Sequence, residues 1–192
     1  MLIAFAGCDG AGKTTVAKKL VEFIKSRGVD VVASKEPTNS KFGRKLRYSF
    51  DNDKRLGPTK EAEWFLKDRQ IHVKDFIDPA LEAGQTVVLD RYYYCTAAYS
   101  GALGMDPEKI IADNEVFAPR PDLVLYLDVS PKVSIERTSD RDTSEPKEQG
   151  KIRNVYQKLA MCRRGYMAII PTDNRTVEEV ATMCCKLFLE HQ

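Results

Sequence analysis

The residues that could do chemistry begin at Gly7, where the chain reads Gly-Cys-Asp-Gly-Ala-Gly-Lys-Thr. This run matches G-x-x-x-x-G-K-[ST], in which glycines let backbone N–H groups turn toward phosphate oxygens at a helix N-terminus. The motif predicts that Lys13 reaches the β- and γ-phosphates of ATP and that the Thr14 hydroxyl binds Mg²⁺. The predicted ATP-binding residues here are Gly7, Cys8, Asp9, Gly10, Ala11, Gly12, Lys13, Thr14 and Thr15.

A second chemical signal is an acidic residue at the end of an apolar run. Residues 86–89 read Thr-Val-Val-Leu and are followed by Asp90. A carboxylate at the end of a buried strand, beside a phosphate-binding loop, is typical of the residue that holds Mg²⁺ through water. Thr14 and Asp90 are therefore the predicted metal-binding pair, and Mg²⁺ is the predicted cofactor.

Composition excludes several other classes. Thirty Lys and Arg residues nearly balance 28 Asp and Glu residues, so no basic cluster indicates nucleic acid as a partner. The five cysteines form no C-x-x-C pair, which argues against a disulfide framework or a zinc site and favours the cytoplasm. No apolar run predicts a membrane span, and the N-terminus lacks the basic start of a signal peptide. Without an N-K-x-D motif for guanine, a regulatory GTPase is not expected.

The elements that must position these residues alternate along the chain. Short apolar runs predict strands at residues 2–6, 31–33, 86–89, 123–127 and 167–170. Helical spacing or capping predicts helices at residues 13–27 and 60–83, and from residues 131, 151 and 176 onward. Alternation of this kind predicts an α/β P-loop fold of three layers: a parallel five-stranded sheet with helices on both faces. Residues 1–192 are expected to form one domain, with a charged, mobile lid at about residues 137–150.

Further motifs fall in the order found in thymidylate kinases, and the chain resembles that family over nearly its whole length. The Asp-Arg-Tyr run at 90–92 resembles the family's D-R-[YH] segment, and Phe65 to Arg69 resembles its F-x-x-x-R helix. The other matching segments are Lys-Glu-Pro-Thr at 35–38, Gly-Arg-Lys-Leu-Arg at 43–47, Pro-Arg-Pro-Asp-Leu at 119–123 continuing to Asp128, and Arg-Asn-Val-Tyr at 153–156. The resemblance implies transfer of the γ-phosphate of ATP to dTMP, giving dTDP and ADP.

The resemblance also implies which residues bind dTMP. Phe65 would stack on thymine and Arg69 would donate to a thymine carbonyl, while Arg47 and Arg91 would clamp the phosphate, with Arg44 in reserve for Arg47. The remaining implied contacts are Asp9 to the sugar 3′-hydroxyl, Thr96 to the pyrimidine edge, and Tyr99 in the space of a ribose 2′-hydroxyl. Phe65 and Tyr99 are also compatible with purely structural packing.

The catalytic residues implied are Lys13, Arg91 and an arginine near the transferred phosphoryl group. Because Gly10 stands where some members carry that arginine in the P-loop, the lid must provide it. Arg141 is the predicted catalytic arginine and Arg137 the predicted adenine contact. His72, expected on a helix surface, and His191, expected at a frayed C-terminus, are not catalytic candidates.

Two departures and two alternatives stay open. Lys35 replaces an arginine of the family's R-E-P-G-G run, and Thr38-Asn39 replaces its glycines, so the resemblance does not define how this loop approaches the acceptor phosphate. One alternative is another nucleoside monophosphate or deoxynucleoside kinase of the same fold, for example one acting on dUMP. The other is a P-loop module that binds nucleotide without catalysis. The family also implies a homodimer, with the helix at residues 60–83 a candidate for its interface.

Overall fold

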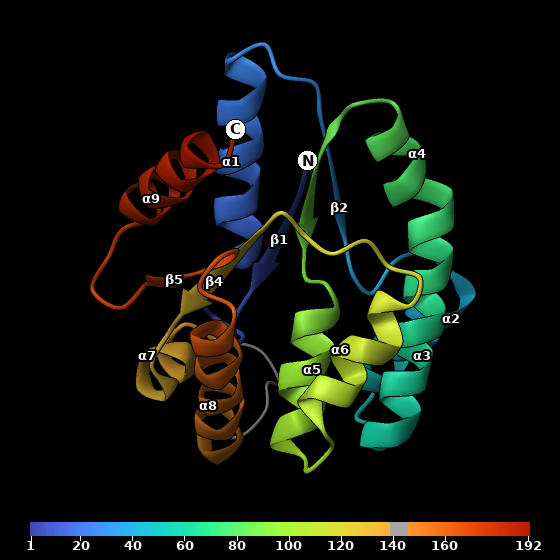
Figure 1. The fold of residues 1–192 in the computed structure, drawn as a ribbon. Coiled ribbons are helices and arrows are strands. Elements are labelled where there is room, and N and C mark those ends of the chain that lie inside the picture. Colours follow the sequence, from blue (N-terminus) through green and yellow to red (C-terminus); the bar gives the residue numbers. More distant parts are fainter. Residues whose placement is uncertain (139–145) are drawn as a thin grey trace.

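The protein is described by a computed structural model that covers residues 1–138 and 146–192. Five parallel strands form one sheet in the order β2-β3-β1-β4-β5 (Figure 1). Their bounds are β1 Leu2–Ala6, β2 Val31–Lys35, β3 Thr86–Asp90, β4 Leu123–Asp128 and β5 Met167–Pro171. The predicted fold class and the five predicted strands are confirmed.

The three central strands are buried along their whole length. Every residue of β1, β3 and β4 is buried, as expected for parallel strands covered on both faces. In the register, Phe5 of β1 lies opposite Asp90 of β3, which also lies opposite Lys35 of β2. The carboxyl ends of β1, β2 and β3 therefore meet at one edge of the sheet, where the motifs of the sequence converge.

Two helices, α1 and α9, pack against one another and against the sheet (Figure 1). Their bounds are Lys13–Ser26 and Val177–Glu190. Helix α1 begins directly after the P-loop, and Val16, Leu20 and Ile24 form its buried face. The predicted capping box at the start of α9 is confirmed, because Thr176 and Glu179 each bond the other's backbone N–H.

The remaining helices pack among themselves and cover the rest of the sheet. They are α2 Lys41–Asp51, α3 Pro58–His72, α4 Asp78–Glu82, α5 Tyr93–Ala102, α6 Pro107–Glu115, α7 Pro131–Glu136 and α8 Pro146–Cys162. The predicted helix at residues 60–83 corresponds to α3 and α4 joined by a π-helical segment, η1 Val73–Ile77. In Figure 1 these three segments follow one another as one column.

The predicted lid at about residues 137–150 is wrong at its end. Helix α8 begins at Pro146, five residues before the predicted start at residue 151. Proline is favoured in the first turn of a helix, where no intrahelical N–H bond is lost, and this signal outweighs the high charge of the segment. Within the residues described, no helix is both long and apolar enough to cross a bilayer.

Candidate active site

The P-loop lies so close to neighbouring backbone that only glycine fits at two positions. Gly7 has φ of 142°, and a Cβ there would lie 2.5 Å from the Leu127 carbonyl oxygen. Gly10 has φ of 75°, and a Cβ there would lie 2.7 Å from the Ser134 carbonyl oxygen. Positive φ and close approach both require a residue without a side chain. The glycines therefore set the course of the loop between β1 and α1.

Lys13 is buried within this loop. Its Nζ donates to the carbonyl oxygens of Gly7 at 2.9 Å and Cys8 at 2.7 Å. Burial and the nearby positive charge of Arg91 together lower the pKa of Lys13 to about 8, against the opposing effect of Asp9. A lysine in this setting carries a charge whose partners in the protein are mainly neutral, so an anionic phosphate would stabilise it.

Thr14 and Asp90, the predicted metal-binding pair, are in contact. The Thr14 hydroxyl donates to Asp90 Oδ2 at 2.5 Å, which joins the first turn of α1 to the end of β3. The other carboxylate oxygen, Oδ1, is buried and has no hydrogen bond within the part of the chain that the structure describes. A buried carboxylate oxygen left unsatisfied beside a hydroxyl fits a hard cation such as Mg²⁺, which takes oxygen ligands and keeps several waters. No cluster of three or more acidic, His or Cys ligands exists among the described residues, so phosphate oxygens and water would complete the shell.

Cys8, although inside the P-loop, is not set up to react. Burial raises the pKa of its thiol to about 12, and its Sγ lies 3.9 Å from the Gln149 carbonyl oxygen. Since the thiolate is the reactive form of cysteine, Cys8 serves packing and contributes its backbone to the loop.

An ion pair connects the P-loop to the end of β3. Arg91 Nη2 donates to Asp9 Oδ1, and the Arg91 guanidinium lies over the Tyr99 ring, 5.7 Å from its centroid. Burial alone would raise the pKa of Asp9, but the charges of Arg91 and Lys13 and the hydrogen bond from Arg91 outweigh it and lower that pKa. Arg91 has φ of 76°, which is unusual for a residue with a side chain. Arg91 adopts this conformation directly after β3, where its side chain contacts Asp9.

One cavity of about 560 Å³ adjoins this ion pair. All seven residues predicted to bind dTMP line it: Asp9, Arg47, Phe65, Arg69, Arg91, Thr96 and Tyr99. They come from the P-loop, α2, α3, the end of β3 and α5. Arg44 is exposed, does not line the cavity, and donates instead to the Asn39 carbonyl oxygen at 2.5 Å. The structure thus distinguishes Arg47 from its reserve candidate by position.

Arg69 is the most enclosed of these side chains, at 1% exposure. Its Nε and Nη2 both donate to the Glu36 carboxylate, at distances from 2.5 to 3.2 Å. Its Nη1 donates to Asn114 Oδ1 at 2.6 Å, and Nη2 also donates to Thr96 Oγ1 at 3.2 Å. Three acceptors, on Glu36, Asn114 and Thr96, thus surround the planar guanidinium group. They fix its orientation where Arg69 borders the cavity.

His72 extends this network, and the prediction that it lies on a helix surface is wrong. The side chain is buried, with Nδ1 3.0 Å from Glu36 Oε1 and Nε2 2.7 Å from Ser34 Oγ. Its ring also stacks on Phe76 at 5.6 Å. Glu36 stands in the Lys-Glu-Pro-Thr motif, but local spacing does not show that a strand end and two residues of α3 converge on it.

Phe65 is backed by a second aromatic ring that sequence reasoning missed. Phe50 of α2 stacks on Phe65 with centroids 6.2 Å apart, and the Arg55 guanidinium lies 5.0 Å from the Phe50 centroid. Glu61 holds Arg55 through two hydrogen bonds of 2.8 and 2.7 Å. All four residues line the cavity, so Phe65 faces it as the end of a supported stack. Phe50 of α2 and Phe65 of α3 belong to different helices. No local sequence pattern identifies Phe50 or Arg55 as residues of this cavity.

The two arginines predicted for the lid differ in what the structure describes. Arg137 donates to the Gly10 carbonyl oxygen at 3.4 Å and to the Thr172 carbonyl oxygen at 3.0 Å, so it joins the P-loop to the chain after β5. Arg141 lies outside the described residues. A further arginine, Arg153 of α8, forms a bidentate pair with Asp128 at the end of β4, at 2.7 and 2.8 Å. That pair connects two of the family-like motifs of the sequence.

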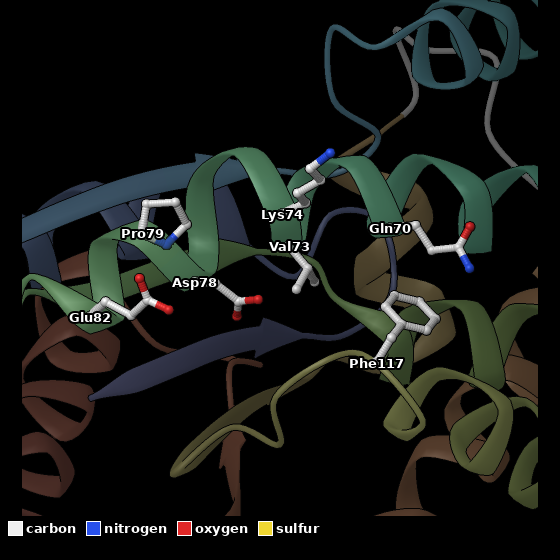
Figure 2. A pocket seen from close by; sticks show the side chains of 7 residues that line it. All are labelled: Gln70, Val73, Lys74, Asp78, Pro79, Glu82 and Phe117. Atoms are coloured by element: carbon white, nitrogen blue, oxygen red, sulfur yellow. The ribbon is translucent and has the colours of Figure 1, made fainter.

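A second hollow, of about 380 Å³, lies away from the P-loop. Figure 2 shows the side chains that line it, most of them on α3, η1 and α4, with Phe117 facing them from the segment after α6. Its charged members are Lys74, Asp78 and Glu82. The hollow is shallow and shares no residue with the cavity beside the P-loop, so the predicted chemistry does not lie there.

Comparison with known proteins agrees with this geometry. The model of the thymidylate kinase family matches residues 5–184. A probable thymidylate kinase of Archaeoglobus fulgidus is 41% identical over 180 residues, which cover 94% of this chain and 90% of the relative. Thymidylate kinases of Desulfotalea psychrophila (44% identical, covering 85% of this chain and 77% of the relative) and Akkermansia muciniphila (43%, covering 88% and 78%) are also similar. With a P-loop, a strand-end acid and these relatives, the chain belongs to the thymidylate kinase family of phosphotransferases.

Proposed function

We propose that this enzyme transfers the γ-phosphate of ATP to dTMP, giving dTDP and ADP. The observation that carries the proposal is the cavity around Asp9, Arg47, Phe65, Arg69, Arg91, Thr96 and Tyr99, which adjoins the P-loop. It combines two guanidinium groups for a phosphate dianion with an aromatic ring and polar groups for a base. A nucleoside monophosphate needs this combination, and the names of the relatives specify thymidylate.

In this mechanism an oxygen of the dTMP phosphate attacks the γ-phosphorus, and the bond from that phosphorus to the β,γ-bridging oxygen breaks. Lys13 and the backbone N–H groups of the P-loop balance charge on the donor. Arg91 and Arg47 hold the acceptor phosphate, which is already anionic, so no general base is required. Thr14 and Asp90 would hold Mg²⁺, which when bound would neutralise charge at the donor phosphates. Phosphoryl transfer depends on such positioning more than on covalent participation by the protein.

The rest of the cavity would select the acceptor. Phe65 would stack on thymine, with Arg69 and Thr96 toward its polar edge. Asp9 would accept the 3′-hydroxyl of the sugar, and Tyr99 would occupy the space of a ribose 2′-hydroxyl. Asp9 also forms an ion pair with Arg91. The residue that would bind the sugar therefore contacts the residue that would bind the phosphate.

Arg141 is proposed as the catalytic arginine of the lid and Arg137 as a contact to adenine. Arg137 lies beside Gly10 of the P-loop, which supports its assignment to the donor side. Arg141→Ala should lower kcat far more than it raises KM for dTMP. A kcat within about threefold of wild type, less than about 1 kcal/mol, would remove Arg141 from the mechanism.

The acceptor is tested by ADP release from ATP and Mg²⁺ with each nucleoside monophosphate in turn, followed in a coupled assay. Strong stimulation by dTMP, weaker stimulation by dUMP and none by AMP, CMP or GMP is expected. Since one methyl group in an apolar pocket contributes about 1–3 kcal/mol, the expected ratio of kcat/KM between dTMP and dUMP is about 10–200. Equal response to several monophosphates would favour a broader kinase, and no response would favour a module that binds nucleotide without catalysis.

A homodimer is also proposed, with residues 60–83 in its interface. The shallow hollow of Figure 2 lies on this stretch, and Val116, close in sequence to its lining residue Phe117, is 85% exposed. Sedimentation at micromolar concentration should give twice the mass of the chain, and a monomer at all concentrations would contradict the proposed dimer.

A cytoplasmic location stays a prediction from the five free cysteines.

A further inference from the structure

We infer that Asp68 is a positioning residue for recognition of the acceptor phosphate, although it does not line the cavity. It would act through the loop at residues 37–40, which carries the hydrogen-bond partners of Arg47. The inference deepens the proposed function and rests on it, because it concerns how the same cavity selects a phosphorylated acceptor.

Asp68 is a fully buried carboxylate held by uncharged donors. Its Oδ2 accepts from the backbone N–H of Thr38 at 2.8 Å. Its Oδ1 accepts from the hydroxyls of Thr38 and Ser40, both at 2.6 Å. Asp68 is 0% exposed, and no ion pair to it is found within residues 1–138 and 146–192. A buried carboxylate is stable only where its hydrogen bonds are satisfied. Asp68 therefore depends on the donors of this loop, and the loop conformation depends on Asp68 as their acceptor.

The same loop grips Arg47 on either side of Thr38. Arg47 Nη1 donates to the Pro37 carbonyl oxygen at 2.7 Å, and Nη2 donates to Asn39 Oδ1 at 2.6 Å. Thr38, between these two partners, is the residue that Asp68 holds through both backbone and side chain. A shift of Thr38 would therefore move both partners of the guanidinium at once.

Helix α2, which carries Arg47, also begins against Asp68. Ser40 is its N-cap, and its hydroxyl accepts from the N–H groups of Phe42 and Gly43 while donating to Asp68. A Cβ at Gly43 would lie 2.1 Å from the Thr38 carbonyl oxygen and 2.8 Å from Asp68 Oδ1. The start of α2 is thus packed tightly onto the loop and the carboxylate, and this sets where Arg47 projects.

This arrangement gives a role to the departure from the family's R-E-P-G-G run. Thr38 supplies a hydroxyl donor and Asn39 the amide oxygen that Arg47 uses, neither of which glycine can supply. Ser40, the next residue, adds a second hydroxyl donor. The altered loop is therefore fastened by side chains, with Asp68 as their common acceptor. Because Arg69 follows Asp68 directly on α3, one turn of helix serves the base-facing and phosphate-facing parts of the cavity.

The test compares two ligands that differ only in the phosphate, thymidine and dTMP, by calorimetry on wild type and Asp68→Asn. The amide introduced at position 68 would place an NH₂ donor beside the N–H and hydroxyl donors of Thr38 and Ser40, so at least one of their hydrogen bonds would be lost. The affinity for dTMP should fall about tenfold, as expected for one or two lost hydrogen bonds to a charged group, while the affinity for thymidine stays within about twofold. KM for dTMP should rise with little change in KM for ATP. Asp30→Asn, the same exchange at an exposed position that lies outside both the cavity and residues 60–83, is the matched control and should change neither affinity.

A double-variant cycle tests the route through Arg47. In an Arg47→Ala background, Asp68→Asn should cause no further loss of dTMP affinity, because the partner it positions is gone. If Asp68→Asn does not fold, Thr38→Val removes one hydroxyl donor at nearly constant volume and should show the same split between dTMP and thymidine on a smaller scale. Equal losses for thymidine and dTMP, or a loss that adds fully to that of Arg47→Ala, would overturn the inference. Failure of wild type to bind dTMP at all would instead overturn the proposed function.

Discussion

The two halves of the active site are built by different means. On the donor side, the P-loop is shaped by glycine backbone, and most of the proposed groups come from one short run, Gly7 to Thr14, joined by Asp90 and Arg137. On the acceptor side, the cavity is shaped by side chains from α2, α3, α5 and the end of β3, which hold one another through buried charges. The donor side is therefore mainly local in sequence, whereas the acceptor side depends on contacts between residues far apart in the chain.

The largest expected effect concerns the buried charge network of the acceptor side. Glu36→Gln leaves the Arg69 guanidinium buried at 1% exposure without its anionic partner. Loss of one partner of a buried pair is expected to lower the free energy of unfolding by about 3–5 kcal/mol, measured by urea denaturation. Glu190→Gln, which breaks an exposed pair with Lys186 on α9 outside residues 60–83, should leave the urea midpoint unchanged. Equal urea midpoints for both variants would show that the buried charge network of the acceptor side contributes no more to stability than an exposed ion pair.

A donor-side variant should affect rate without affecting stability to the same degree. Lys13→Met keeps a long buried side chain but removes the charge expected at the β- and γ-phosphates. By analogy with removal of one charge-stabilising donor, kcat should fall about 10²- to 10³-fold. The urea midpoint should not fall, since an uncompensated buried cation has also been removed. A kcat within about threefold of wild type would contradict the role of Lys13.

The aromatic stack should contribute to acceptor binding alone. Phe65→Ala removes the ring that faces the cavity in front of Phe50, and loss of base stacking costs about 1–3 kcal/mol. KM for dTMP should therefore rise about 10- to 100-fold while KM for ATP stays constant. Phe42→Ala, on the same helix as Phe50 but outside the cavity, serves as the control. A similar rise in both KM values would show that Phe65 supports the fold and not the base.

The smallest effect expected is a pH dependence on the donor side. Burial and Arg91 lower the pKa of Lys13 to about 8, so the lysine is cationic below that pH and neutral above it. At saturating dTMP, kcat/KM for ATP reports the ionisation of the enzyme before ATP binds. It should fall as the pH rises through about 8, approaching about tenfold per pH unit beyond it. A flat profile up to about pH 9.5 would place the pKa of Lys13 near the ordinary lysine value.

How much of the fold and site could be predicted follows the same division. The P-loop, Asp90, the five strands and the fold class are all encoded in local patterns, and the structure agrees with them. Helix α5 was not predicted because nearly all its residues are buried, so no polar face marks a helical period. His72 was misplaced because helical spacing cannot show which surface a distant strand end will cover.

The acceptor residues were reached by resemblance and not by local chemistry. Arg69 one turn after Phe65 is readable from spacing, but its bonds to Glu36, Asn114 and Thr96 span 33, 45 and 27 positions. Phe50 and Arg55 had no signal at all, since a hydrophobic residue on a helix and a charged residue in a loop occur everywhere. Long-range side-chain pairs of this kind become visible only once the chain is folded.

One covalent detail sets a limit on how far the two halves can drift apart. Asp90, which is proposed to hold the metal, is the last residue of a fully buried strand, and Arg91, which is proposed to hold the acceptor phosphate, follows it directly. Their Cα atoms are therefore about 3.8 Å apart by bond geometry alone. The peptide bond between Asp90 and Arg91 fixes the distance between their Cα atoms. Movements of the helices around the cavity would therefore change contacts with the nucleoside and leave that distance unchanged. Fraying of β3 would move both residues together relative to the P-loop without changing their spacing, and β3 is hydrogen-bonded on both sides.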